Sequence, residues 1–262
     1  MDALLAFHGI DESGSVLSYA PDDFERLLDG LQAEGVAVVA LDELLAPVAS
    51  AAGAPAAASA AALAGAPHRV ALTFDDGFTS VHAAALPRLA RRKLPFTVYA
   101  VADWIGRDNR WPTQTPGIPR FPLMDATQLR ELVAAGATLG GHTATHADCR
   151  GLDAAALRRE LVDSKETLQQ LLQQEVRHFA WPYGRFDAAA DAAMRPHWSS
   201  AVTTRLAYLP PPSARDVHAL PRLDSWYLRA PERRLPLFSS RTRAWIAWRR
   251  ALRAVKGAAY GT

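Results

Sequence analysis

The sequence predicts an α/β protein built as a single-domain distorted (β/α) barrel, and three observations favour this fold class. Short apolar runs of strand length alternate with amphipathic helical segments along most of the chain, as in sheets whose parallel strands are connected by helices. Polar residues capable of chemistry directly follow four of these runs, as expected where active-site residues collect at the carboxyl ends of strands. The chain has 262 residues, 49% of them hydrophobic, which is enough for one large core.

In the first part of the chain, strands are expected at residues 4–7, 36–40, 70–74 and 96–101. Helices are expected between these strands, from Pro21 to Gly35 and at residues 41–45 and 80–92. Residues 48–66 are almost wholly Ala, Gly, Ser and Pro, so we expect a surface insertion with partial helix. A loop that contains Pro and Trp follows at residues 103–122.

In the second part, Asp125 is expected to cap a helix through Ala135, with a strand at residues 137–140. A long amphipathic helix is expected from Asp153 to Gln174. Further strands are predicted at residues 179–181, 200–203 and 217–220.

The C-terminal residues differ in character from the rest. We assign the barrel to residues 1–238 and expect a basic amphipathic helix at residues 239–262. An apolar stripe runs along this helix among arginines, and its members are Trp245, Trp248, Leu252 and Val255. Such a helix either docks on the barrel or lies on an anionic membrane surface.

Composition excludes several function classes. A formal net charge of +2 provides no extended basic surface for nucleic acid. Cys149 is the one cysteine, so any metal must be bound by histidines and carboxylates. No apolar stretch approaches the roughly 18 residues of a membrane-spanning helix, and the first residues lack the basic segment of a signal peptide. We therefore expect a cytoplasmic protein, with peripheral contact at the inner face of the membrane as the alternative role of the C-terminal helix.

Two adjacent carboxylates, Asp75 and Asp76, follow the strand at residues 70–74. Adjacent acids in loops are often solvated turn residues, but unpaired charges at the tip of a buried strand are costly. A metal ion or a cationic partner would offset that cost. Since neighbouring side chains point in different directions, one carboxylate could bind a metal while the other transfers protons.

Two histidines, His142 and His146, follow the strand at residues 137–140, and paired glycines precede them. On a helical turn this spacing places both imidazoles on one face, close enough to share one ion. With a carboxylate they form a two-histidine, one-carboxylate set that suits Zn²⁺ hydrolysis or, in a different scaffold, Fe²⁺ oxygenation. Hydrolysis fits better, because a second carboxylate is available as a base.

Together these motifs resemble those of the polysaccharide deacetylases that share the NodB homology domain, carbohydrate esterase family 4. Residues 73–78 are Thr-Phe-Asp-Asp-Gly-Phe, residues 142–146 are His-Thr-Ala-Thr-His and residues 182–184 are Pro-Tyr-Gly, in the family's order. The resemblance implies a metal-dependent hydrolase that removes an acetyl group, in the first place an N-acetyl group, from a carbohydrate. It points to an acetamido sugar of a surface glycan or its lipid-linked precursor as substrate, and to Zn²⁺ as the expected divalent ion.

The same resemblance implies roles for individual residues. Asp75 corresponds to the catalytic base, and the metal ligands correspond to Asp76, His142 and His146. The backbone N–H of Tyr183 corresponds to the group that helps to stabilise the oxyanion.

The sequence also departs from the commonest family pattern. Ala180 stands where an arginine usually pairs with the base, and no Leu-x-x-His motif occurs near the C-terminus. Phe7-His8 and the segment at residues 220–224 are similar to segments of the poly-N-acetylglucosamine deacetylase branch. This similarity implies that His8 is the general acid and that Arg222 orients the base. His218 is the competing acid, and Arg222 could instead be a surface cation.

Two other functions stay open at this point. An amidase acting on a small non-sugar amide could use the same barrel and metal. A sugar-binding module that has lost catalysis would explain the missing arginine at position 180, although the intact carboxylate and histidine set opposes it.

Overall fold

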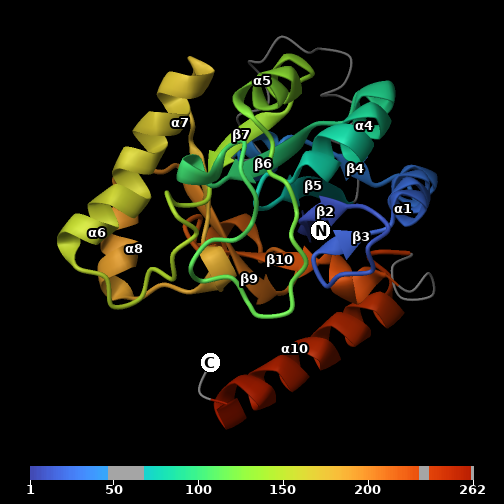
Figure 1. Cartoon of the computed structure of the whole chain (residues 1–262). Coiled ribbons are helices and arrows are strands. Elements are labelled where there is room, and N and C mark those ends of the chain that lie inside the picture. The colour runs from blue at the N-terminus through green and yellow to red at the C-terminus, as the bar shows by residue number, and fades with distance from the viewer. Residues whose placement is uncertain (47–67, 230–235, 261–262) are drawn as a thin grey trace.

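The computed structural model describes residues 1–46, 68–229 and 236–260, and at its centre parallel strands form a closed barrel (Figure 1). The strands are β1 (Asp2–Phe7), β5 (Arg69–Phe74), β6 (Phe96–Ala100), β7 (Thr138–Gly141), β8 (His178–Ala180), β9 (Ser200–Leu206) and β10 (Leu220–Asp224). They are ordered β1-β10-β9-β8-β7-β6-β5, and the barrel closes because β1 pairs with both β10 and β5. The predicted α/β barrel is therefore confirmed.

Helices surround this barrel (Figure 1). They are α1 (Pro21–Ala33), α2 (Leu41–Leu45), α4 (Leu86–Arg92), α5 (Ala126–Ala134), α6 (Ala154–Arg158), α7 (Ser164–Leu172), α8 (Ala188–Met194) and α10 (Ser240–Tyr260). π-Helical turns precede two of them, η1 (Val81–Ala85) and η3 (Arg159–Asp163). The short 3₁₀ turns are η2 (Ala102–Trp104), η4 (Pro182–Gly184), η5 (Pro212–Ala214) and η6 (Ser225–Leu228), and the remaining short strands are β2 (Gly9–Ile10), β3 (Ser18–Tyr19) and β4 (Ala37–Val38).

Outward-facing aromatic residues join the barrel to its helices. Phe7 of β1 and Phe74 of β5 are register partners, and their ring centroids lie 5.3 Å apart. Both rings also contact Phe24 of α1, and all three side chains are fully buried. Large aromatic rings bury much apolar area, so this contact contributes strongly to the free energy of folding.

The interior of the barrel is a packed core. It is filled by side chains from six strands, namely Leu4, Ala71, Tyr99, Ala180, Val202 and Leu220. Leu41 and Leu44 of α2 join the same cluster. On β7, a Cβ atom at Gly140 would lie only 2.4 Å from the Tyr99 ring, so the tyrosine requires glycine there. Because the interior is filled, chemistry can take place only at an end of the barrel.

Local capping signals predicted two helix starts correctly. Asp125 accepts a hydrogen bond from the backbone N–H of Gln128 in a complete capping box before α5. Asp153 accepts from the backbone N–H of Ala156 at the start of α6. The long helix expected to follow Asp153 is interrupted by η3.

Other expected elements differ from the structure. The strand predicted at residues 217–220 begins only at Leu220, because His218 and Asp216 form a turn in which the His218 N–H donates to Asp216 Oδ1. Arg195 holds that turn by donating to Asp216 Oδ2. The strand predicted at residues 36–40 is reduced to β4, and the insertion predicted at residues 48–66 lies outside the described residues.

Helix α10 packs on the barrel beside β9. Thr242 and Ile246 of this helix are buried, and the Trp245 indole donates to the Tyr227 carbonyl at 3.1 Å. The predicted apolar stripe is thus divided, because Trp248 and Val255 are exposed at 52% and 68%. Among the described residues, no helix combines the length and apolar character needed to cross a membrane.

Candidate active site

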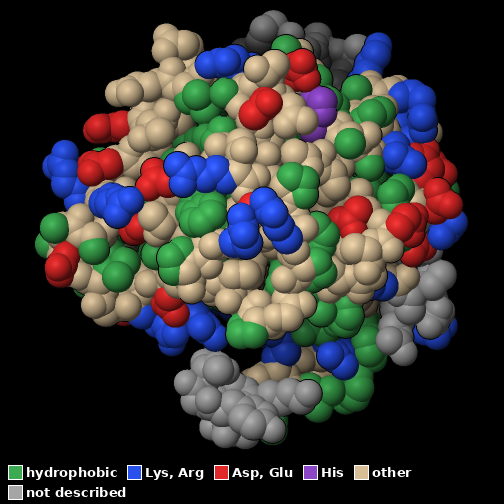
Figure 2. All heavy atoms as spheres, viewed as in Figure 1, with side chains coloured by type: hydrophobic (Ala, Val, Ile, Leu, Met, Phe, Trp, Pro, Cys, Tyr) green, Lys and Arg blue, Asp and Glu red, His purple; other side chains and the backbone are tan. Residues whose placement is uncertain are grey.

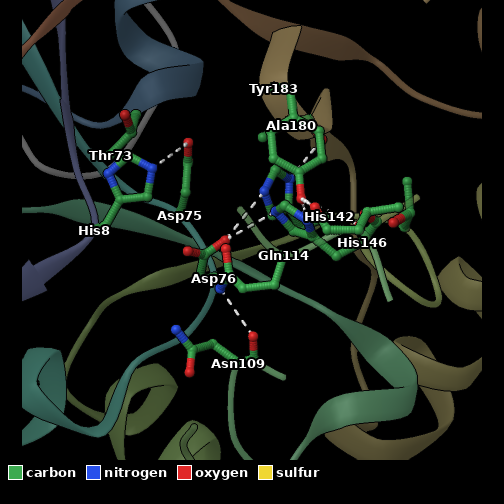
Figure 3. Close-up of polar contacts among 12 residues, drawn as sticks. His8, Thr73, Asp75, Asp76, Asn109, Gln114, His142, His146, Ala180 and Tyr183 are labelled. Atoms are coloured by element: carbon green, nitrogen blue, oxygen red, sulfur yellow. Dashed lines mark hydrogen bonds and ion pairs between the residues drawn. The ribbon is translucent and has the colours of Figure 1, made fainter. Parts of the chain in front are cut away.

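The residues with predicted chemical roles meet at the carboxyl ends of the barrel strands. These ends share one face because all the strands of the barrel are parallel. In Figure 3 Asp75 lies between the His8 ring and the group formed by Asp76, His142 and His146.

Asp76, His142 and His146 form the centre of the site. The Nε2 atoms of His142 and His146 lie 3.4 and 3.2 Å from Asp76 Oδ1, and all three side chains are buried. Burial alone would raise the pKa of Asp76, but the two imidazoles outweigh that effect and hold the pKa well below its usual range. The Asp76 carboxylate is therefore ionised.

These donor atoms fit a divalent metal ion. One ligand atom from each of the three residues lies within 4.8 Å of the others. Asp76 Oδ1 is buried yet accepts no hydrogen bond from the described residues, an arrangement that is costly unless another group pairs with it. Two metal–ligand bonds of about 2.1 Å at a tetrahedral angle place the ligand atoms about 3.4 Å apart, close to the distances from Asp76 Oδ1 to the two imidazoles.

Hydrogen bonds on the far side of each imidazole aim its Nε2 at Asp76. His142 donates from Nδ1 to the carbonyl of Ala180 at 2.7 Å, and a carbonyl can only accept. His146 donates from Nδ1 to the Tyr183 hydroxyl oxygen at 3.1 Å, and that hydroxyl donates to the Thr113 carbonyl at 2.6 Å. In a neutral imidazole, an Nδ1–H that donates in this way leaves Nε2 without a proton, as a metal ligand requires.

The backbone around these histidines is not the helical turn that their spacing predicts. Residues 142–146 form an irregular loop in which Thr143 and His146 have φ angles of 65° and 60°. Asp76 and Tyr183 also have positive φ angles, 69° and 58°. Side chains other than glycine rarely adopt this conformation, and such strain concentrates at functional sites. The imidazoles converge because the loop turns, and helical periodicity plays no part.

Glu160, which the sequence analysis missed, holds this loop in place. It is buried on η3, and its Oε2 accepts from the backbone N–H groups of Ala144 and Thr145, both at 2.9 Å. Its Oε1 accepts from the Thr145 hydroxyl at 2.8 Å. The available signal was a charged residue on the apolar face of the helix, beside Leu157 and Leu161.

Replacing Glu160 with glutamine should weaken metal binding or turnover by roughly 10–100-fold, the usual effect of losing a group that orients metal ligands. The glutamine amide nitrogen cannot accept a hydrogen bond, so part of the loop loses its support. Glu166→Gln, at an exposed position on α7, is the matched control and should leave both properties unchanged. Equal metal affinity and turnover in Glu160→Gln and the wild type would show that the loop at residues 142–146 keeps its conformation without the Glu160 carboxylate.

Trp111 is the second residue that the sequence analysis left without a role. Its ring stacks on the His146 ring, with centroids 4.2 Å apart and an interplanar angle of 19°. Trp111 belongs to the loop at residues 103–122, which Asn109 ties together by donating to the Pro119 carbonyl and accepting from the Phe121 N–H. This loop therefore forms one wall of the site.

Arg222 extends from β10 to Asp75. Its Nη1 and Nη2 donate to Asp75 Oδ1 and Oδ2 at 2.7 and 2.6 Å, and its Nε donates to the Thr203 carbonyl at 3.0 Å. Arg222 is only 2% exposed, so the alternative of a surface cation is wrong. Burial alone would raise the pKa of Asp75, but Arg222 outweighs it and holds that pKa below its usual value. Asp75 is therefore ionised and fixed in direction.

The two candidate acids lie in different places. His8 Nε2 is 4.0 Å from Asp75 Oδ2, and the His8 side chain is 26% exposed (Figure 3). His218 precedes β10, and its Nε2 donates to the carbonyl of Trp198, which precedes β9. His218 thus lies toward the amino-terminal ends of the strands, away from Asp75.

Comparison with known proteins adds family information to this geometry. Residues 63–197 match the family model for polysaccharide deacetylases. YxkH of Bacillus subtilis strain 168, which is described as a polysaccharide deacetylase, is 26% identical over 136 residues. That match covers 52% of this chain and 44% of YxkH, so the chain spans less than half the length of this relative.

Solved structures share the fold. IcaB from Ammonifex degensii superimposes with a TM-score of 0.69 and 24% identity, over 94% of this chain and 96% of IcaB. The Streptococcus pyogenes deacetylase PplD gives 0.66 and 21% identity, over 85% of this chain and 91% of PplD. The BpsB deacetylase domain from Bordetella bronchiseptica gives 0.65 and 18% identity, over 85% of this chain and 94% of that domain.

Proposed function

The chain belongs to the polysaccharide deacetylase family, and we propose that it hydrolyses an N-acetyl group on a carbohydrate with the help of a divalent metal ion, Zn²⁺ being the expected one. The observation that carries this proposal is the buried group of Asp76, His142 and His146 beside an ionised Asp75. We propose an acetamido sugar of a surface glycan, or of its lipid-linked precursor, as the substrate.

The residues of this chain divide the work of amide hydrolysis. When bound by Asp76, His142 and His146, a divalent ion supplies Lewis acidity toward the acetyl carbonyl and lowers the pKa of water. Asp75, aimed by Arg222, accepts the proton of the attacking water. The backbone N–H of Tyr183 donates to the oxyanion. His8 protonates the leaving nitrogen, the C–N bond breaks, and acetate and a free amine result.

Arg222 also bears on the alternative functions. The missing arginine at position 180 was the feature that favoured a sugar-binding module without catalysis. Since Arg222 holds Asp75 from another strand, that feature no longer favours such a module.

Acetate release tests the proposed function directly. The metal-loaded protein should release acetate from an acetylated chitooligosaccharide or from a lipid- or nucleotide-linked acetamido sugar. Tight sugar binding without acetate release from any of these would favour the binding module. Release from small non-sugar amides alone would favour the amidase.

The proposed role of His8 predicts a kinetic effect without a structural one. His8→Ala should keep its metal and its melting temperature, because the half-buried ring contributes little packing, while turnover falls by roughly 10²–10⁴-fold. The alkaline limb of the pH–rate profile should change as well, since that limb reports loss of the proton from the acid. His218→Ala is the control and should keep normal turnover. Wild-type turnover in folded His8→Ala would overturn the assignment.

The peripheral contact of α10 with a membrane and the cytoplasmic location stay predictions. Trp248 and Val255 are exposed on this helix, as such a contact would need.

A further inference from the structure

A cleft of about 620 Å³ lies between β9 and α10. This volume is typical of small-ligand sites. Arginines contribute to its lining from both sides, Arg205 from β9 and Arg250 and Arg253 from α10, and Phe186 and Leu206 add apolar walls. Lys and Arg side chains are present at the lower edge of the molecule, where α10 runs below β9 and β10, as well as elsewhere on this face (Figures 1 and 2). None of the residues that line the cleft is one of the catalytic or metal-binding residues proposed above.

The charged residues that line this cleft are all positive. The lining contains three arginines and no acidic residue. Within the described residues, none of the three forms an ion pair; the Arg205 guanidinium donates only to the Ala219 carbonyl at 3.2 Å, and the Arg253 guanidinium lies 5.9 Å from the centroid of the Tyr227 ring. Arg195, by contrast, is paired with both Asp191 and Asp216. Positive charges that converge without a counter-charge repel one another, and an anion would relieve that repulsion.

Residues that line the cleft are connected to two residues of the candidate active site, Tyr183 and Arg222. Gly184, which lines it, directly follows Tyr183. Thr204, also in the lining, donates from its hydroxyl to the Tyr183 carbonyl at 3.1 Å. Thr203 lines the cleft and accepts from Arg222 Nε through its carbonyl. The residues that border the cleft therefore also contact Tyr183 and Arg222, and the proposal below requires a substrate that extends from the cleft to the candidate active site.

We propose that this cleft is an anion subsite that binds a phosphate group of the substrate. Guanidinium groups present paired N–H donors that match phosphate oxygens, and three of them around one cleft favour phosphate over a neutral sugar. This inference rests on the proposed function, and it narrows the substrate to an acetamido sugar that carries phosphate on the same unit or on a neighbouring one. A phospholipid headgroup offers the same chemistry, and the experiment separates the two sources.

The test compares two double variants of α10 that remove the same charge. Arg250→Ala/Arg253→Ala removes the two cleft arginines of α10, whereas Arg241→Ala/Arg243→Ala removes two arginines outside the cleft. Binding of N-acetylglucosamine 1-phosphate and of N-acetylglucosamine is measured by calorimetry, which needs no turnover. Acetate release from a neutral chitooligosaccharide is measured alongside and should be unchanged in both double variants.

We expect the wild type to bind the phosphorylated sugar at least about 10-fold more tightly than the neutral sugar, and only the cleft variant to lose that difference. Equal binding of the two sugars by the wild type, or an equal loss in both variants, would overturn the subsite.

Cosedimentation with phosphatidylglycerol vesicles is the second arm of the test. Vesicle binding that depends on Arg250 and Arg253, without a preference for the sugar phosphate, would assign the cleft to lipid and overturn the proposal. Because binding is measured apart from acetate release, failure of the subsite and failure of the proposed function can be distinguished.

Discussion

Replacing His142 or His146 with alanine is expected to abolish both metal retention and acetate release. Each imidazole is one of the three proposed protein ligands, and each is held in place by its own hydrogen bond, to Ala180 or to Tyr183. Losing a ligand should therefore exceed the roughly 10–100-fold effect of losing a supporting group such as Glu160. Elemental analysis of the purified variants gives the metal content, and an acetate assay gives the activity.

The control is His82→Ala, which removes a histidine whose only described partner is Glu131, on the surface of the molecule. This variant should keep one equivalent of metal and normal turnover. A full equivalent of metal in either His142→Ala or His146→Ala would show that the ligand set is wrong.

Asp75→Asn is expected to keep the metal while turnover falls by roughly 10²–10⁴-fold, because an amide cannot accept the proton of water at neutral pH. Asp76→Asn should instead weaken metal binding, since Asp76 faces both imidazoles. The opposite result, metal loss in Asp75→Asn and metal retention with lost turnover in Asp76→Asn, would show that the two carboxylates have exchanged roles.

In Asp75→Asn a loss of stability accompanies the expected loss of turnover, because Arg222 loses its ionic partner. A double variant separates the two effects. Asp75→Asn leaves the buried Arg222 guanidinium without its partner, and breaking a buried ion pair costs about 3–5 kcal/mol in the free energy of unfolding. Asp75→Asn/Arg222→Met removes both charges and should recover most of that stability. Turnover should stay as low as in Asp75→Asn, which a role limited to stability would not explain. Recovery of turnover together with the melting temperature would exclude Asp75 as the base.

Several features could be predicted from the sequence because they depend on neighbouring residues. Asp125 and Asp153 cap helices through bonds to N–H groups three positions ahead, so a short segment is enough to specify them. The alternation of apolar runs with amphipathic segments likewise predicted the barrel, because each strand and each helix has a hydrophobic periodicity within its own segment.

The errors concern features that distant contacts decide. The strand expected at residues 217–220 starts later because Arg195, more than twenty positions away, holds the turn at Asp216. Local spacing predicted a helical turn for His142 and His146, but Glu160 and the rings of Trp111 and Tyr183 hold an irregular loop there. These partners lie 15 to 37 positions from the residues that they hold, too far for local periodicity to reveal them.

The sequence by itself determined which side chains are predicted to carry the chemistry, since carboxylates and imidazoles at strand ends stand out by residue type and spacing. Only the tertiary structure decided how they are held. Arg222 and Asp75 are 147 positions apart, and they meet because β1 pairs with both β10 and β5 and so closes the barrel around them. The same closure places His8 beside Asp75 and leaves His218 toward the other end of the strands. A side chain's direction in a closed barrel depends on the register of strands far apart in the chain, and no local pattern encodes that register.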